Sequence, residues 1–422
     1  MIKSIKVETA SSRIILIIAG FLCLAVIFFF AKWCFANAIA AKAPSIEIAE
    51  LSVDLASNDP QTHYALAVLN EKTFFSEDLP KSLREFEQAV ALSPNDFRLW
   101  LEYGKARERS GDDAGAELAL RKALEFAPNY AQVRWTLGNV LLRRGKIREA
   151  LLEIRRAAES DKNYRIPAVA AAWQIFDGKV ANIKQSIGDS ANLNSALMMF
   201  LAKQKRFAEA VEIWNALPAE EKKTTLKTEG EALFGELIAA KQYRTALKIQ
   251  TSIDDKSNAE NFAPGKIFNG GFEAEVKREK ATVFDWQIAD GGQPQIGFDD
   301  NQKVGGTRSL VIIFNSIDGR DFRQVSQIIV VEAAKKYGFS LFYKSDLKTS
   351  GTLRWEIVDD SNGKILATTN PISANADWTN LKTEFVTAAS TEAVTVRLVR
   401  ESCKSIICPI AGKVWFDDFS VN

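Results

Sequence analysis

The sequence predicts a chain of three parts: a membrane-spanning helix, an α-solenoid and an antiparallel β-sandwich, which together make a multidomain α plus β protein. Three observations lead to this fold class. An uncharged apolar run lies near the N-terminus, the middle of the chain matches itself at an offset of 34 residues, and the patterning changes from helical to alternating near residue 253. At 422 residues, the chain is long enough for two or three globular domains.

Composition excludes several classes of function. Lysine and arginine number 54 against 53 aspartate and glutamate residues, which leaves a formal charge of +1. A nucleic-acid surface would therefore need local clustering of cations, and we expect no nucleic-acid partner. The single histidine, His63, is too few for histidine-dependent triads and most zinc sites. It falls on the first helix of the predicted solenoid, where we expect an ordinary packed or solvated side chain.

The N-terminal apolar run, residues 14–31, has eighteen residues without a charge. A helix of about twenty residues is needed to cross about 30 Å of hydrocarbon. Three basic residues precede the run, and Lys32 and Trp33 follow it at interface height. The positive-inside rule then places residues 1–13 in the cytoplasm. We expect a transmembrane anchor over residues 14–34, in a single-pass bacterial inner-membrane protein whose bulk lies in the periplasm or outside the cell.

A cleaved signal peptide is the alternative interpretation of this run. Ala36-Asn37-Ala38 and Ala41-Lys42-Ala43 both fit an A-x-A cleavage pattern, although a signal peptide usually has an apolar core of about 7–15 residues. Both interpretations export the rest of the chain. Residues 35–60 would connect the anchor to the solenoid.

The internal repeat is clearest where residues 96–129 align with residues 130–163 without a gap. Gly104 matches Gly138, and Ala116 matches Ala150, so small residues recur where paired helices must approach closely. Two prolines, Pro94 and Pro128, stand where the second helix of a unit must end. This pattern resembles the tetratricopeptide repeat over about residues 61–164.

Helical patterning continues beyond these repeats. The segments "LAKQKRFAEAVEIWNAL" and "LIAAKQYRTALKIQTSI" look like two degenerate units, with Ala210 and Ala246 at the small-residue position. We therefore expect one curved solenoid of about four to six helical hairpins over residues 61–252.

The resemblance implies that the first helices of the hairpins line a concave face that binds an extended peptide or a partner's helix. In tetratricopeptide repeats this face is formed by fixed positions of the first helix. Those positions are occupied here by Arg98, Leu101, Lys105, Arg109, Trp135, Asn139 and Arg143. Cations beside a tryptophan favour a protein partner that offers an acidic or carboxylate-terminated peptide. The alternative is that these charges only solvate the helix surface.

Beyond a linker at residues 253–265, apolar residues alternate with polar ones. In "YGFSLFYKS", Tyr337, Phe339, Leu341 and Tyr343 share one face. Glycine-rich breaks separate several segments of this kind, which predicts a sandwich of two antiparallel sheets over residues 266–422.

Four segments of this region, "IFNGGFE", "GGTRSLVI", "YGFSLFYKS" and "VWFDDFSV", occur in the order found in certain jelly-roll, galactose-binding-like domains. They resemble the carbohydrate-binding modules of families four, nine and twenty-two. In those modules the first and last strands lie close together and often share a structural calcium ion. The resemblance implies calcium ligands at Glu273 and Asp417, with Asp418 as a substitute. The alternative is that these carboxylates only cap strand ends or meet solvent.

The resemblance also implies a polysaccharide ligand, although the fold alone does not fix this function. Sugar sites combine exposed aromatic rings with planar polar groups. Side chains on the non-core faces of predicted strands provide a candidate groove: Phe342, Lys344, Arg354 and Arg397. Four tryptophans have core packing as the alternative role: Trp286, Trp355, Trp378 and Trp415.

Two cysteines near the C-terminus, Cys403 and Cys408, are close enough to close a small disulfide loop in an exported chain. Cys23 and Cys34 lie in or beside the apolar run and have no evident partner.

Two classes of function remain open. We expect a non-catalytic scaffold whose exported repeats bind a protein and whose sandwich binds glycan, in assembly or export of a cell-surface polysaccharide. The alternative is a carbohydrate-active enzyme, or its accessory subunit, with catalytic carboxylates that the sequence does not reveal. No nucleophile elbow or phosphate loop is present in the sequence, which favours the scaffold.

Overall fold

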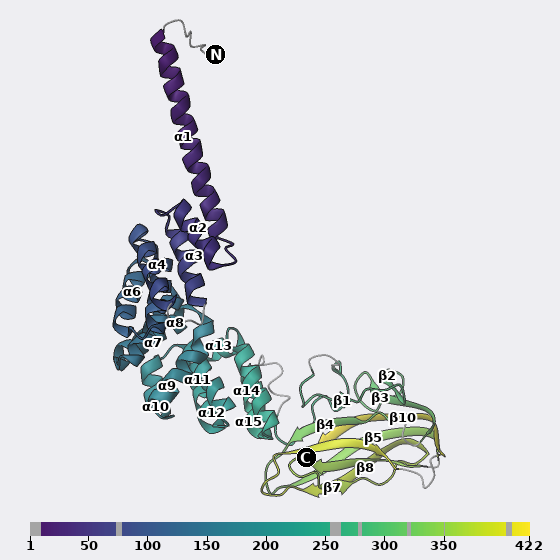
Figure 1. Cartoon of the computed structure of the whole chain (residues 1–422). Helices are drawn as coiled ribbons and strands as arrows, with labels where there is room; N and C mark the ends of the chain where they lie inside the picture. Colours follow the sequence, from purple (N-terminus) through teal and green to yellow (C-terminus); the bar gives the residue numbers. More distant parts are fainter. Residues whose placement is uncertain are drawn as a thin grey trace. The chain divides into compact units, whose positions relative to one another are not determined.

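The computed structural model describes residues 10–72, 78–253, 263–276, 281–318, 322–349, 351–401 and 407–422. Helices occupy the chain up to Ile253, and strands follow from Gln287 to Val421 (Figure 1). The predicted fold class is confirmed: an apolar N-terminal helix, helical hairpins and two antiparallel sheets follow one another. The chain forms two compact units, Met1–Leu197 and Met198–Asn422.

The first helix, α1 (Ala10–Ala40), is long and apolar enough to cross a membrane, and its most apolar window is not buried by the protein. Its 31 residues correspond to about 46 Å, which exceeds the hydrocarbon thickness of about 30 Å. The helix continues past the expected end of the anchor, and its last turns pack into the first unit. Ala36 is fully buried, and the Asn37 side-chain amide donates to the Asp59 carboxylate.

Helical hairpins make up the rest of the first unit. Its helices are α2 (Ile46–Leu55), α3 (Pro60–Lys72), α4 (Asp78–Leu92), α5 (Phe97–Arg109), α6 (Asp113–Phe126), α7 (Ala131–Arg143), α8 (Ile147–Ser160), the 3₁₀ helix η1 (Lys162–Tyr164), α9 (Arg165–Ile175) and α10 (Val180–Ile187). The unit boundary falls inside the next helix, α11 (Ala191–Lys203). The expected domain bounds, with one solenoid over residues 61–252, therefore stay a prediction.

The repeated glycines hold the helices of each hairpin together. A Cβ atom on Gly104 would lie 2.7 Å from Leu120 Cγ, and one on Gly138 would lie 2.6 Å from Ile154 Cγ1. A larger side chain would push α5 from α6 and α7 from α8, so the close approach inferred from the repeat is present. His63 lies on α3 and is buried in the α3–α4 hairpin, where Nδ1 lies 2.6 Å from Glu85 Oε2. Its Nε2 atom lies 2.9 Å from the Ser57 carbonyl oxygen.

The second unit combines helices and strands. After α11 come α12 (Phe207–Ala216), α13 (Ala219–Lys223), α14 (Lys227–Ala239) and α15 (Tyr243–Ile253). Ala210 and Ala246, the two matched residues of the degenerate repeats, are both fully buried. The linker expected at residues 253–265 lies mostly outside the described residues.

Among the described residues, ten strands form the β-sandwich. They are β1 (Gln287–Ile288), β2 (Gln295–Asp299), β3 (Ser309–Asp318), β4 (Val325–Val330), β5 (Lys336–Thr349), β6 (Leu353–Asp359), β7 (Ile365–Thr368), β8 (Asn375–Val386), β9 (Ala393–Arg400) and β10 (Ile407–Val421). The first sheet has the order β1-β4-β9-β6-β7, and the second sheet has the order β2-β3-β10-β5-β8. All strand pairs are antiparallel, which confirms the predicted sandwich.

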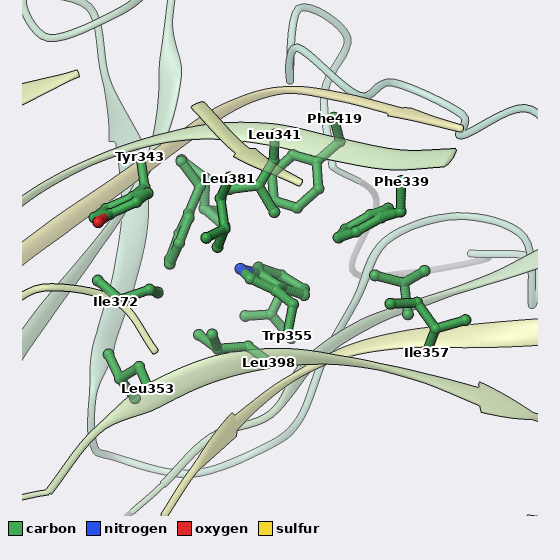
Figure 2. Packing of buried hydrophobic residues seen from close by; sticks show 14 of the residues in the cluster. Phe339, Leu341, Tyr343, Leu353, Trp355, Ile357, Ile372, Leu381, Leu398 and Phe419 are labelled. Atoms are coloured by element: carbon green, nitrogen blue, oxygen red, sulfur yellow. The ribbon is translucent and has the colours of Figure 1, made fainter. Parts of the chain in front are cut away.

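An aromatic core fills the space between the sheets. Figure 2 shows Trp355 of the first sheet facing apolar side chains of the second. The Trp355 ring lies 4.9 Å from the Phe419 ring and 5.4 Å from the Phe416 ring in edge-to-face geometry. Trp286 and Trp355 are 2% and 0% exposed, so the alternative core role holds for these two tryptophans.

The last helix, α15, packs directly on the first sheet. Tyr243 and Leu247 are buried against Phe284, Val330 and Ala393. Arg244 Nε donates to the Val331 carbonyl oxygen at 2.8 Å, and the Tyr243 hydroxyl bonds the Asp360 carboxylate. Burial and the Asp360 carboxylate raise the pKa of the Tyr243 hydroxyl well above its ordinary value. The final helical hairpin and the sandwich therefore share buried surface and polar contacts within the second unit.

Candidate functional site

The solenoid face that the repeat register singles out is rich in cations, but each cation has a carboxylate partner. Arg98 pairs with Asp96 at 2.7 Å, and Lys105 pairs with Glu102 at 2.7 Å. Arg109 bonds Glu71, and Arg143 bonds both Glu108 and Asp113. These pairs leave little uncompensated positive charge for an acidic peptide.

The remaining residues of this face differ in exposure. Leu101 is only 3% exposed and belongs to the hydrophobic core, so it does not lie on an open surface. Trp135 is half-buried, with its ring 5.2 Å from the Tyr164 ring. Asn139 is also half-buried on α7. The face therefore offers aromatic and neutral polar groups more than free charge.

The four residues expected in one glycan groove divide between the two sheets. Phe342 and Lys344 lie on β5 of the second sheet, whereas Arg354 on β6 and Arg397 on β9 belong to the first. Both arginines have carboxylate partners: Arg354 bonds Glu401, and Arg397 lies 2.8 Å from Glu356. A single groove containing all four residues is wrong, because strand pairing places the two pairs in different layers of the sandwich.

The outer face of the second sheet brings Phe342 and Lys344 together with residues that were not assigned to the groove. In the strand register Phe342 stands between Asp417 of β10 and Asn380 of β8. Lys344 stands next to Trp415 of β10. On its other side, a bulge in β8 sets two residues, Asp377 and Trp378, against it.

Two features of this outer face are unusual for a surface that only meets solvent. The Asn380 Oδ1 atom is buried without a hydrogen-bond partner, and a buried polar atom without a partner costs about 1–3 kcal/mol. The Trp415 indole N–H donates to Asp299 Oδ2 at 2.9 Å, which fixes the ring. This bond also lowers the pKa of the Asp299 carboxyl. Strand alternation in "NADWTNLKTEFV" could have identified Asn380 and Trp378, because both fall on the face opposite buried Leu381.

The three acidic residues predicted to hold calcium meet around a glycine. A Cβ atom on Gly271 would lie 3.6 Å from Asp418 Oδ1, 3.7 Å from Glu273 Cγ and 3.8 Å from Asp417 Oδ1. The structure thus places the first and last segments of the sandwich side by side, as the resemblance implied. All three carboxylate side chains thus come within van der Waals reach of this one position.

Hydrogen bonds engage two of the three carboxylates. Glu273 accepts from the Thr307 hydroxyl at 2.6 Å and from backbone N–H groups, which lowers its pKa. Asp417 Oδ2 accepts from the N–H groups of Val304 and Gly305 at 2.8 and 3.2 Å. Among the described residues, no group of three or more acidic, histidine or cysteine side chains is already arranged to hold a metal ion.

Asp418 differs from its two neighbours. Its carboxylate accepts no hydrogen bond from the described part of the chain, and its pKa is raised by burial and by the charges of Asp417 and Glu273. A cation beside these residues would relieve that repulsion, and each carboxylate oxygen keeps lone pairs for it. The charge and the position of the three residues therefore fit a hard cation, although their oxygens would have to shift.

Cys408, on β10, is buried and disulfide-bonded. The second member of the predicted pair, Cys403, lies outside the described residues. The two cysteines of α1, Cys23 and Cys34, are free.

Comparison with known proteins gives partial similarities. No family model matches the chain. The peroxisomal targeting signal receptor of Saccharomyces cerevisiae is 23% identical over 151 residues, which are 35% of this chain and 24% of the receptor. The receptor of Candida albicans is 30% identical over 105 residues, which are 25% of this chain and 17% of that protein. The chain spans less than a quarter of the length of these curated relatives.

Solved structures show weaker similarity. A structure of CBM4 matches 37% of this chain and 98% of its own, with 19% identity and a TM-score of 0.28. A crystal structure of MamA matches 28% of this chain and 67% of its own, with 19% identity and a TM-score of 0.26. The helical part of the chain has tetratricopeptide-like repeats, and the part after it is a β-sandwich.

Proposed function

We propose that the protein is a non-catalytic, membrane-anchored adaptor whose solenoid binds a protein and whose β-sandwich binds a neutral polysaccharide. The observation that carries the glycan part is the outer face of the second sheet. There, Phe342 and Trp378 flank the unpaired Asn380 amide oxygen.

The chemistry of this face suits a sugar. Aromatic rings stack on the C–H faces of pyranose rings, and planar amides bond pairs of hydroxyl groups. A sugar hydroxyl would satisfy Asn380 Oδ1, which the protein itself leaves without a donor. Lys344 is held by Asp377 at 3.0 Å, so the ligand need not be charged. These features favour a neutral glycan over an acidic one.

The solenoid and α1 supply the protein-binding surface and the membrane anchor of the proposed adaptor. Stacked hairpins form extended surfaces that bind peptides or helices of other proteins. The length and apolar surface of α1 support a membrane anchor, with the solenoid and sandwich on the exported side. An exported adaptor of this kind would hold a partner protein near a growing or exported cell-surface polysaccharide.

We also propose a structural calcium ion held by Glu273, Asp417 and Asp418. Calcium takes six to eight oxygen ligands at about 2.3–2.6 Å, and backbone carbonyls complete its shell where carboxylates are few. The ion would neutralise three carboxylates that converge around Gly271. Its role would be to tie the first and last segments of the sandwich together.

Native affinity electrophoresis tests the glycan proposal. Full-length protein in mild detergent would migrate through gels that contain a neutral β-glucan, a xylan or a galactan. We expect at least one of these to retard the wild type, and Phe342→Ala and Trp378→Ala each to abolish most of the retardation. Arg397→Ala, on the first sheet, is the matched control and should migrate like the wild type. Equal loss in all three variants, or no retardation of folded protein by any neutral glycan, would reject the proposal.

A further inference from the structure

Three cavities on the first unit of the solenoid adjoin one another. The first, of about 410 Å³, lies between the end of α1 and α3, and the second, of about 300 Å³, shares Gln61 and Tyr64 with it. The third, of about 550 Å³, shares Tyr130 and Gln132 with the second and ends at Tyr164. Together they form one trough, which we call the tyrosine trough after these residues.

Five neutral polar side chains of the tyrosine trough are available to a ligand. Within the part of the chain that the structure describes, five of its side chains make no hydrogen bond to other protein groups: Gln61, Tyr64, Tyr130, Gln132 and Tyr164. Three phenol hydroxyls and two amides therefore remain available along a single path. Burial raises the pKa of Tyr64 and Tyr164, so both hydroxyls stay protonated donors at neutral pH.

Charge in the middle of the trough is compensated within the protein. Asp96 and Arg98 lie 2.7 Å apart, and Glu102 is held by Lys105 at 2.7 Å. Other cations lie only toward the two ends, where Lys42 and Lys72 line one and Lys162 lines the other. A charged ligand would have to break existing ion pairs to bind the middle of the trough.

The rings of the trough are held in place by other rings. Tyr130 lies 5.0 Å from Phe97, Tyr164 lies 5.2 Å from Trp135, and Tyr64 lies 6.0 Å from Phe86. Such fixed aromatic walls lose little conformational entropy when a ligand packs on them.

We propose that the tyrosine trough binds an extended, uncharged, proline-rich segment of the partner protein. A polyproline II chain has no internal hydrogen bonds, so its carbonyl oxygens are free to accept from tyrosine hydroxyls and glutamine amides. Its pyrrolidine rings pack flat against fixed aromatic side chains, which is how proline-rich segments are recognised in aromatic-lined grooves. The inference rests on the proposed protein-binding role of the solenoid and names the chemistry of the partner.

Fluorescence anisotropy with a fluorescein-labelled decaproline peptide tests this inference. Full-length protein in mild detergent should bind decaproline, and should not bind a glycine-serine peptide or decaglutamate of the same length. Because the uncharged peptide forms no ion pair with the trough, the affinity should be nearly the same in 50 and 500 mM NaCl, where the Debye length changes about threefold.

Tyrosine-to-phenylalanine variants keep the rings and remove only the hydroxyl groups. We expect Tyr64→Phe, Tyr130→Phe and Tyr164→Phe each to weaken decaproline binding about fivefold, and the triple variant to abolish it. Tyr343→Phe, in the sandwich, is the control and should bind like the wild type. The inference would be overturned if the folded triple variant bound decaproline as tightly as the wild type does. It would also be overturned if the wild type bound decaglutamate and not decaproline.

Further binding experiments distinguish failure of this inference from failure of the proposed protein-binding function. A random peptide pool that yields a Tyr130-dependent ligand without proline would leave the protein-binding solenoid in place and refute the proline-rich chemistry. Failure of every peptide to bind folded protein would refute both. A neutral oligosaccharide that binds in a Tyr130-dependent way would show that the trough is a sugar site, and would also overturn the inference.

Discussion

Replacing Asp418 by asparagine should have opposite effects with and without calcium. In the metal-free protein, burial and the charges of Asp417 and Glu273 raise the pKa of Asp418 above its ordinary value of 3.8. A raised folded-state pKa means that the stabilising contribution of this group is present below the unfolded pKa and lost as pH rises through the folded pKa. At neutral pH the ionised Asp418 therefore costs stability, and Asp418→Asn should raise the melting temperature.

Calcium should reverse the order of the two melting temperatures, so that the wild type melts above Asp418→Asn. An ion bound only by the folded state adds about 2.7 kcal/mol at a hundredfold excess over its dissociation constant. The unit that contains the site spans Met198–Asn422. For a unit of this size, about 1 kcal/mol shifts the midpoint by roughly 2–4 °C, so calcium should raise the wild-type midpoint by about 5–11 °C. Asp418→Asn removes a charged ligand and should lose most of that gain.

Differential scanning calorimetry of the full chain, with excess chelator or with millimolar calcium, measures both effects. Asp346→Asn removes an exposed carboxylate on β5 and is the matched control, which should change neither midpoint. The calcium proposal would be refuted if the wild type and Asp418→Asn had the same midpoint as each other both in chelator and in calcium. An increase in the calcium response of Asp418→Asn would contradict the role given to its carboxylate.

Three other predictions concern the rest of the chain. The bond to Glu85 is the main reason why the pKa of His63 is raised, so His63 should titrate above its ordinary pKa of 6.5. NMR measures this directly, because the single histidine gives one signal; a pKa below 6.5 would contradict that contact. Arg244→Ala leaves the Val331 and Thr391 carbonyl oxygens without their donor and should lower the free energy of unfolding of the second unit by about 2 kcal/mol in urea; an unchanged midpoint would refute the coupling of α15 to the sandwich. Full-length protein should stay with membranes after carbonate extraction if α1 is an anchor, whereas a mature N-terminus near Ala38 or Ala43 would indicate a signal peptide.

Local patterns in the sequence predicted the elements well. The offset of 34 residues gave the register of the helices, because Gly104 and Gly138 recur where two helices touch. Alternation in "YGFSLFYKS" identified the buried face of β5, where Tyr337, Phe339 and Leu341 all lie in the core. Such patterns depend on the period of a single helix or strand, which neighbouring residues determine.

Contacts between distant segments limited the prediction of sites. Arg143 looked like a free cation, but its partners Glu108 and Asp113 belong to the preceding repeat. Lys344 and Arg397 both point away from the core, yet strand order puts them on opposite sheets. The pairing of strands and of charges across repeats depends on tertiary contacts that no local period encodes.

The position of the glycan tests the central proposal most directly. Hydrogen–deuterium exchange of full-length protein would be followed with and without the neutral polysaccharide that retards it in native gels. We expect protection in β5 and β8, over residues 338–344 and 376–382, with no change in β6 and β9 of the first sheet. Protection confined to residues 353–359 and 393–400, or no protection anywhere in the sandwich at saturating glycan, would contradict a binding site on the outer face of the second sheet.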